Sequence, residues 1–258
     1  MELNTYPLVC TRGVVLYPNQ EIVIDVGRDT SVHAVENAQD NYDKKICLFS
    51  QKELEQENPG KEDIYPVGTL CEVRHIRRFD NFLRVKFRGI KCVKLNNWIN
   101  GSLSDLAEVE ILESEKQDAV EEEALIRMIA DELDRMQGQD RFVTKEIVME
   151  ISKGMGGEFL SDKAVQGLPL DIERKQQYLE TLGVNDRLMM LLQDMAKEKK
   201  MSEVEQQINE TVKERIDQGQ KDYYLREKMN VIREELGDTV AQDEDAAKIR
   251  KRLAENPY

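Results

Sequence analysis

Residues 82–88 have the sequence Phe-Leu-Arg-Val-Lys-Phe-Arg, in which apolar and basic side chains alternate. Successive side chains of a β-strand point to opposite faces, so the leucine, the valine and the second phenylalanine share one face and the three basic residues share the other. The alternation predicts a strand with one face in a core and the other in water. Gly89 is expected to end this strand or to permit a bulge before residues 90–95 resume the alternation.

Short segments rich in β-branched residues precede this strand, and Gly, Pro, Asn or Asp bounds each of them. They are residues 8–10, 14–16, 22–26, 46–49 and 68–73. Among them, residues 29–41 are expected to form a helix that Asp29 or Thr30 caps. Strands this short and this closely spaced predict a curved sheet or a small β-barrel, which we assign to residues 1–117.

The apolar residues recur with the period of a helix from Ser114 onward. Asp118 is expected to cap a first helix that ends at Gly138. Its buried stripe is predicted to consist of Leu125, Met128, Ile129, Leu133 and Met136. Shorter helices are predicted after Thr144, near Ser161, from Asp171 and from Asn185. These helices predict a bundle over residues 118–195, and the fold class of the whole chain is therefore α+β.

Residues 196–237 are predicted to form a long, coiled-coil-like helix that projects from the bundle. Its apolar residues before Gly219 are Met201, Val204, Ile208, Val212 and Ile216, and those after it are Leu225, Met229, Ile232 and Leu236. Charged residues fill the other positions, so the apolar seam is too narrow for a core helix. We expect it to pack along one partner helix. Residues 238–258 are expected to be an acidic linker and the beginning of a module that the chain does not complete.

The charge of the chain disfavours a nucleic-acid binder. Lys and Arg number 37 against 51 Asp and Glu, which gives a net charge of −14. Residues 1–117 hold 15 basic and 19 acidic residues, so most of the acidity belongs to the helical half. Phosphate binding needs a cationic footprint. The basic face of residues 84–88 is the main candidate, together with Arg74, Arg77, Arg78, Lys91 and Lys94, and we interpret it as a solvated strand face.

The remaining composition indicates a soluble, cytoplasmic protein. No apolar run approaches the roughly 18 residues of a membrane span, and residues 1–6 do not resemble a signal peptide. The four cysteines are unevenly spaced and form no Cys-x-x-Cys pair, which indicates reduced thiols. His33 and His75 match no metal motif, so no metal site is predicted.

Several motifs give the chain a resemblance to a known family. Residues 11–18, Thr-Arg-Gly-Val-Val-Leu-Tyr-Pro, resemble the opening of the N-terminal domain of Lon proteases. Residues 65–73 and 88–90 fit the same domain, and residues 220–229, Gln-Lys-Asp-Tyr-Tyr-Leu-Arg-Glu-Lys-Met, resemble the signature of the long helix before the Lon ATPase module. Thr11 and Asn19 depart from the usual pattern, in which leucine and glycine are frequent.

The resemblance implies a PUA-like β domain and a helical bundle that precede an AAA+ module and a Ser-Lys protease domain in a hexameric, ATP-dependent enzyme. The chain lacks the parts that carry the chemistry. It contains no Gly-x-x-x-x-Gly-Lys-[Ser/Thr] run for ATP and Mg²⁺, and no Gly-x-Ser-x-Gly or Lon-type serine motif. We therefore predict no catalytic, cofactor or metal site here, while the parent enzyme would use ATP and Mg²⁺.

The role implied for this region is to bind unfolded or damaged proteins and to help assemble the hexamer. Apolar and thioether side chains adapt to varied sequences, so Tyr223, Tyr224 and Met229 are predicted to contact such proteins, with Tyr17 and Pro18 as weaker candidates. A second hypothesis is a pure assembly module. Its seam would be Leu225, Met229, Ile232 and Leu236. A third hypothesis, nucleic-acid binding through the basic strand, is disfavoured by the net charge.

Overall fold

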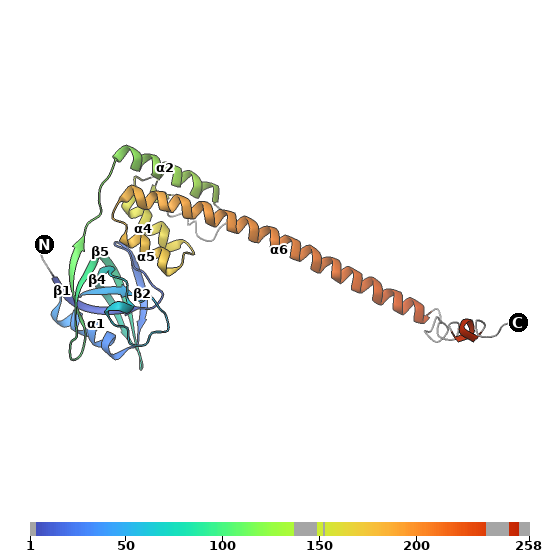
Figure 1. Ribbon diagram of the computed structural model, residues 1–258, viewed down its shortest axis with the longest axis horizontal. Coiled ribbons are helices and arrows are strands. Elements are labelled where there is room, and N and C mark those ends of the chain that lie inside the picture. Colours follow the sequence, from blue (N-terminus) through green and yellow to red (C-terminus); the bar gives the residue numbers. More distant parts are fainter. Residues whose placement is uncertain (1–3, 137–148, 152, 236–247, 253–258) are drawn as a thin grey trace. The chain divides into compact units, whose positions relative to one another are not determined.

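The computed structural model describes residues 4–136, 149–151, 153–235 and 248–252. It divides into two compact units, Met1–Lys199 and Lys200–Tyr258. The strands and helices are β1 (Asn4–Thr11), β2 (Glu21–Val26), α1 (Asp29–Asn41), β3 (Lys45–Ser50), β4 (Val67–Arg78), β5 (Leu83–Ile99), β6 (Leu106–Leu112), α2 (Ala119–Met136), α4 (Gly157–Gly167), α5 (Ile172–Glu180) and α6 (Val184–Glu235), with a 3-10 turn at Lys61–Asp63. In the first unit, α1 lies against the strands, and α2, α4 and α5 gather beside the first turns of α6 (Figure 1). The predicted α+β class is confirmed.

The six strands form one sheet in the order β2-β5-β4-β3-β1-β6. β1 and β3 are parallel, and the other neighbouring pairs are antiparallel. β6 also pairs with the C-terminal half of β5, so the ladder of pairings from β5 through β4, β3, β1 and β6 returns to β5. β2 pairs only with β5 and forms the other end of the strand order.

The alternating segment that opens β5 is built as predicted. Leu83, Val85 and Phe87 are buried in a cluster with residues of α1 and β4, and the basic side chains between them face outward. The strand does not end at Gly89. Cys71 of β4 pairs with Gly89 while its neighbour Leu70 pairs with Lys91, so one residue of β5 is left over. This is the predicted bulge.

One predicted strand and one helix cap are wrong. Residues 14–16 belong to the loop between β1 and β2. The Val14 carbonyl accepts hydrogen bonds from the Thr11 and Ser50 hydroxyls, so side chains occupy the acceptor that a neighbouring strand would use. α1 has the predicted bounds, but Arg28 is its N-cap residue and makes no side-chain cap. β6 was not predicted from the sequence.

The helical half begins as predicted. The Asp118 carboxylate accepts from the backbone N–H groups of Val120 and Glu121 at 2.7 and 3.2 Å and so caps α2. The buried stripe of α2 contains Leu125, Ile129 and Leu133. Met128 is 57% exposed, so its predicted core position is wrong. The three buried residues are spaced four apart and form one row along the helix, and Met128 lies beside that row. Of the predicted second helix, Thr144 lies outside the described residues.

α6 is one continuous helix from Val184 to Glu235. The sequence predicts a short helix from Asn185 and a separate long helix over residues 196–237, but no break occurs between them. The helix also continues through Gly219, where an added Cβ would meet no other atom. A single glycine costs a helix only about 1 kcal/mol relative to alanine, too little to interrupt it. Leu236 lies outside the described residues.

Candidate functional site

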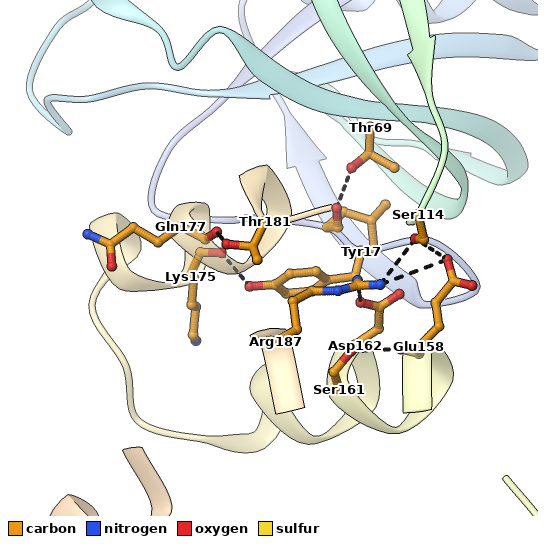
Figure 2. A network of polar contacts seen from close by, with 11 residues as sticks. Tyr17, Thr69, Ser114, Glu158, Ser161, Asp162, Lys175, Gln177, Thr181 and Arg187 are labelled. Atoms are coloured by element: carbon orange, nitrogen blue, oxygen red, sulfur yellow. Dashed lines mark hydrogen bonds and ion pairs between the residues drawn. The ribbon is translucent and has the colours of Figure 1, made fainter. Parts of the chain in front are cut away.

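Tyr17 and Pro18 lie in the loop between β1 and β2, as predicted, but both are buried. Tyr17 is 1% exposed, and its hydroxyl donates to the Lys175 carbonyl of α5 at 2.7 Å (Figure 2). Burial raises the pKa of this hydroxyl well above its ordinary value. The prediction of these two side chains as a contact surface for unfolded proteins does not fit this burial, because Tyr17 packs against the helices and Pro18 is buried as well.

Tyr17 belongs to a hydrophobic core that the sheet and the helices share. Val15, Tyr17 and Val67 contribute to it from the sheet domain. The buried helical residues of the same cluster are Leu125, Ile129, Leu133, Leu160, Ala164, Val165, Leu168, Tyr178, Leu179, Val184, Leu188, Leu191 and Met195. A buried hydrogen bond of 2.7 Å from Gln176 Nε2 to the Val67 carbonyl crosses the same boundary. The first unit is therefore held together by a continuous core and not by a flexible linker.

A buried ion pair lies beside this core. Arg187 Nη1 of α6 contacts Asp162 Oδ1 of α4 at 2.8 Å, and their side chains are 4% and 2% exposed. Arg187 Nη2 also donates to Ser114 Oγ at 3.1 Å and lies 4.0 Å from Glu158 (Figure 2). Burial raises the pKa of Asp162 to about 7, while Arg187 acts in the opposite direction. The network joins the segment that leaves β6 to α4 and α6.

The first turn of α6 takes its cap from a distant side chain. Gln117 Oε1 accepts from the backbone N–H groups of Asn185 and Asp186 at 2.8 and 3.3 Å. Asn185 was expected to cap the helix, but it lies inside the first turn. Its side-chain amide donates to the Asp118 carbonyl and to Glu121. These contacts fix where α6 starts relative to α2.

The second unit contains residues 200–235 of α6, which we call the exposed helix segment. Its large apolar side chains are all exposed to solvent among the described residues: Met201, Val204, Ile208, Val212, Ile216, Tyr223, Tyr224, Leu225, Met229, Val231 and Ile232. Tyr223 is 70% exposed, Tyr224 62% and Met229 53%. A row of exposed apolar side chains of this length is unusual for a helix that has no partner, and such surfaces mark interaction sites.

The apolar residues of the exposed helix segment occupy two sides of the helix. Ile216 and Leu225 are nine positions apart, which is about 2.5 turns, so their side chains point in roughly opposite directions. The sequence predicted that the apolar residues on both sides of Gly219 line one seam against one partner helix. Because the helix is continuous through Gly219, they form two separate seams instead. The first seam is Met201, Val204, Ile208, Val212, Ile216 and Tyr223, and the second seam is Leu225, Met229 and Ile232.

Acidic neighbours balance the basic face of the sheet. Arg84 makes two hydrogen bonds of 2.7 Å to Asp25, and Lys86 lies 2.6 Å from Glu21. The hydrogen bonds lower the pKa of both carboxyl groups. Both acids belong to β2, which pairs directly with β5. The face therefore offers less free positive charge than the sequence alone indicates.

Three features of the described residues bear on metal binding, thiol reactivity and membrane spanning. No three His, Cys, Asp or Glu side chains among them are grouped as metal ligands. All four cysteines are free, and burial raises the pKa of Cys10 and of Cys92 to about 12, which keeps these thiols protonated and unreactive at neutral pH. None of the helices in the described part of the chain combines the length and the apolar character that a membrane span requires.

A family model described as the ATP-dependent protease La (LON) substrate-binding domain matches residues 5–197. The chain belongs to this family. The matched range contains the shared core and the ion pair, and it ends within α6 just before the exposed helix segment.

Two relatives and one solved structure place the Lon match in context. The chain is 32% identical to a Lon protease of Brevibacillus choshinensis over 248 residues, which cover 96% of this chain and 32% of the relative. It is 33% identical to a Lon protease of Syntrophomonas wolfei over 256 residues, 98% of this chain and 31% of the relative. The fold is similar to the N-terminal domain of a Mycobacterium avium complex Lon protease, with a TM-score of 0.61, 18% identity and coverage of 75% and 98%. The chain thus spans about a third of the length of these curated relatives.

The sequence did not predict which side chains join the sheet to the helices in the first unit. Asp162, Gln176 and Arg187 are polar residues in amphipathic helices, where a solvated position is the default expectation. Their partners are distant in the chain, and no local spacing points to them. The Lon resemblance was the available signal, because it includes Tyr17 and Arg187, and a shared motif can indicate a packing role.

Proposed function

We propose that this chain is the region of a Lon-type ATP-dependent serine protease that binds unfolded or damaged proteins and passes them to the ATPase and protease modules. The observation that carries the proposal is the exposed helix segment, where Tyr223, Tyr224 and Met229 each expose more than half of their surface. The substrate-binding description of the family supports the same role. The chain itself is proposed to have no catalytic activity.

The physical argument rests on complementary surfaces. An unfolded protein exposes apolar segments of varied sequence, and a receiver needs apolar side chains that adapt to them. Methionine has a flexible, polarizable side chain, and tyrosine offers a large apolar ring with a polar end. Tyr224 also lies under the Lys228 ammonium, 5.9 Å from the ring centre. This contact orients the ring and leaves one of its faces available.

The test replaces Tyr223, Tyr224 and Met229 together with serine. Binding of a chemically unfolded client to the 258-residue chain and its degradation by the full-length protease are then measured. We expect both to fall several-fold, because the lost side chains supply apolar contact area. The control replaces three exposed polar residues of the same segment, Gln206, Gln207 and Glu210, with serine. Unchanged binding and degradation by the first variant, with its helix content intact, would contradict the proposal.

A second candidate function is assembly without client binding. The second seam, predicted together with Leu236, suits a helix of another subunit, and apolar residues spaced three and four apart are typical of helix pairing. Sedimentation velocity of the chain at several concentrations tests it. Concentration-dependent dimers or larger oligomers without client binding would favour this function. Replacement of Leu225 and Ile232 with serine would then leave only monomers.

A third candidate, binding of DNA or RNA by the basic strand, has less support. Asp25 and Glu21 already hold two of its cations, and the chain has a net charge of −14. A mobility shift with duplex and single-stranded nucleic acid at low salt tests this candidate. A shift that weakens steeply with added salt would favour it.

The properties of the whole enzyme belong to the same proposal. We infer that the parent protein is a cytoplasmic hexamer with ATP and Mg²⁺ in an AAA+ module and a Ser-Lys dyad in a protease domain. The closed path of strand pairings through β5, β4, β3, β1 and β6 is consistent with a PUA-like β-barrel. The domain division proposed from the sequence is 1–117, 118–195, 196–237 and 238–258.

A further inference from the structure

A cavity of about 310 Å³ lies between the end of β1, the end of β2 and the start of α1. Val9, Ile24 and Val26 provide an apolar part of its lining, and Arg12 and Arg28 provide two guanidinium groups. Pockets that bind small ligands start at about 300 Å³ and combine an apolar wall with a few polar groups. The cavity therefore has room for the end of a peptide but not for a folded segment.

Neither arginine forms an ion pair in the described part of the chain, although the charge of Glu57 acts on Arg28 from farther away. Arg28 donates to the Cys10 carbonyl at 3.3 Å, to Gln51 Oε1 at 2.7 Å and to the Gln56 carbonyl at 3.1 Å. Arg12 donates to the same Gln56 carbonyl at 3.3 Å. All these acceptors are neutral, and among the described residues no carboxylate lies within 4.0 Å of either guanidinium.

The donors at this point exceed the acceptors. The Gln56 carbonyl receives a third hydrogen bond, from Gln51 Nε2 at 2.9 Å, although a carbonyl oxygen has only two lone pairs. Burial, and then the charge of Arg12, lower the pKa of Arg28. Asp25 also lines the cavity, but Arg84 already holds both of its oxygens. An anion in the cavity would meet two guanidinium groups with unused hydrogen-bonding capacity.

One strand beside the cavity, β2, also has an open edge. β2 pairs with β5 on one side and with no other strand of the described chain. The end of β1 is less open, because the Leu8 N–H donates to the Asp105 carbonyl at 3.0 Å and the Cys10 carbonyl accepts from Arg28. Unpaired strand edges can hydrogen-bond to the backbone of an extended peptide. The site therefore combines backbone partners, an apolar wall and an anion-binding pair.

We propose that this cavity binds the C-terminal carboxylate of an unfolded polypeptide. Arg12 and Arg28 hold the carboxylate, and the apolar wall of Val9, Ile24 and Val26 receives the last side chain. The inference rests on the proposed client-binding function and specifies which part of a client is bound. A free carboxylate is the anion favoured here because every polypeptide ends in one, and planar guanidinium groups match its two oxygens.

The test uses a short, unstructured peptide that ends in leucine and carries a fluorophore at its N-terminus. Its binding to the 258-residue chain is measured by fluorescence anisotropy, first with a free C-terminal carboxylate and then with a C-terminal amide. Charge-assisted hydrogen bonds are the strong ones, so we expect the amide to bind about tenfold more weakly or worse. Arg12→Gln should weaken the carboxylate peptide to a similar degree and leave the amide peptide unchanged.

Arg127→Gln is the matched control, because it removes the same charge from an exposed i, i+4 pair on α2. It should not change the binding of either peptide. A third peptide has an amidated end and an internal aspartate, and tight binding of that peptide would contradict specificity for the terminus. Equal binding of the acid and amide peptides, unaffected by Arg12→Gln, would overturn this inference but support client binding as such. If neither these peptides nor an unfolded protein binds, both this inference and the proposed function are wrong.

Discussion

Tyr17 offers the sharpest test of how the sheet and the helices are held together. Its ring is buried in the shared core, and its hydroxyl donates to the Lys175 carbonyl at 2.7 Å. Removal of a buried aromatic side chain costs about 3–5 kcal/mol, so Tyr17→Ala should lower the free energy of unfolding by that amount. Tyr17→Phe keeps the ring and removes one hydrogen bond, so it should cost about 1 kcal/mol. Both free-energy losses are measured by urea unfolding, monitored by circular dichroism and by the fluorescence of the single tryptophan.

The control for this experiment is Tyr224, which is 62% exposed on the exposed helix segment. Tyr224→Ala should change the free energy of unfolding by less than about 0.5 kcal/mol. The effects on client binding should be reversed. Tyr224→Ala should weaken client binding, whereas Tyr17→Phe should leave it unchanged. A loss of less than about 1 kcal/mol for Tyr17→Ala, or weaker client binding by a stable Tyr17→Phe variant, would refute the assignment of Tyr17 to the core.

Three further changes test the first unit, each followed by urea unfolding. Burial raises the pKa of Asp162 from about 3.9 in the unfolded chain to about 7 in the folded chain. The folded chain therefore binds this proton more tightly than the unfolded chain does. The stability that proton binding provides is complete below about pH 4 and is lost as the pH rises to about 7. Asp162→Asn should therefore remove a decline in stability between about pH 4 and pH 7 that the unmodified chain shows, and parallel pH profiles would contradict this. Gly89→Ala should cost at least about 1–3 kcal/mol, because the new Cβ would lie 2.2 Å from the Tyr17 carbonyl oxygen; a neutral effect would mean that this approach relaxes freely. Gln117→Ala removes the cap of α6 and should cost about 1 kcal/mol, whereas replacement of the exposed Gln206 should cost close to nothing.

Local periodicity was sufficient for much of the fold. The alternation at 82–88 predicts the start of β5 because one face of that strand is buried and the other is solvated, and the pattern depends on nothing distant. α1 and the capped start of α2 follow from equally local signals. The prediction failed for residues 14–16, because β-branched composition does not reveal that Thr11 and Ser50 side chains occupy the carbonyl that a strand partner would need. It also failed for the single seam of α6. Because the helix continues through Gly219, Leu225 follows Ile216 by about 2.5 turns and faces roughly the opposite side.

The candidate sites were less predictable because exposure is a property of the whole molecule. Tyr17 and Tyr224 are the same residue type in two motifs that resemble the same family, yet one is 1% exposed and the other 62%. Tyr224 was expected to be exposed because its helix has little core, and Tyr17 because it lies in a loop between strands. Arg12 and Arg28 raised no expectation, because an arginine without an ion pair is apparent only once the surrounding side chains are placed.

The residues that carry the Lon resemblance are largely those that the fold constrains. Gly13 has a φ of +68°, which favours glycine, and Tyr17 fills the shared core. Gly89 lies where the β1–β2 loop crosses β5, with no room for a side chain. Such positions tolerate few residue types in this architecture, so a match at them is strong information about fold and family. They carry little information about binding, because a buried side chain cannot contact a client. Residues 220–229 differ from these positions, because Tyr223, Tyr224 and Met229 are exposed and no core packing in the described chain constrains them. Binding measurements on this chain therefore test the exposed helix segment and the arginine pair directly.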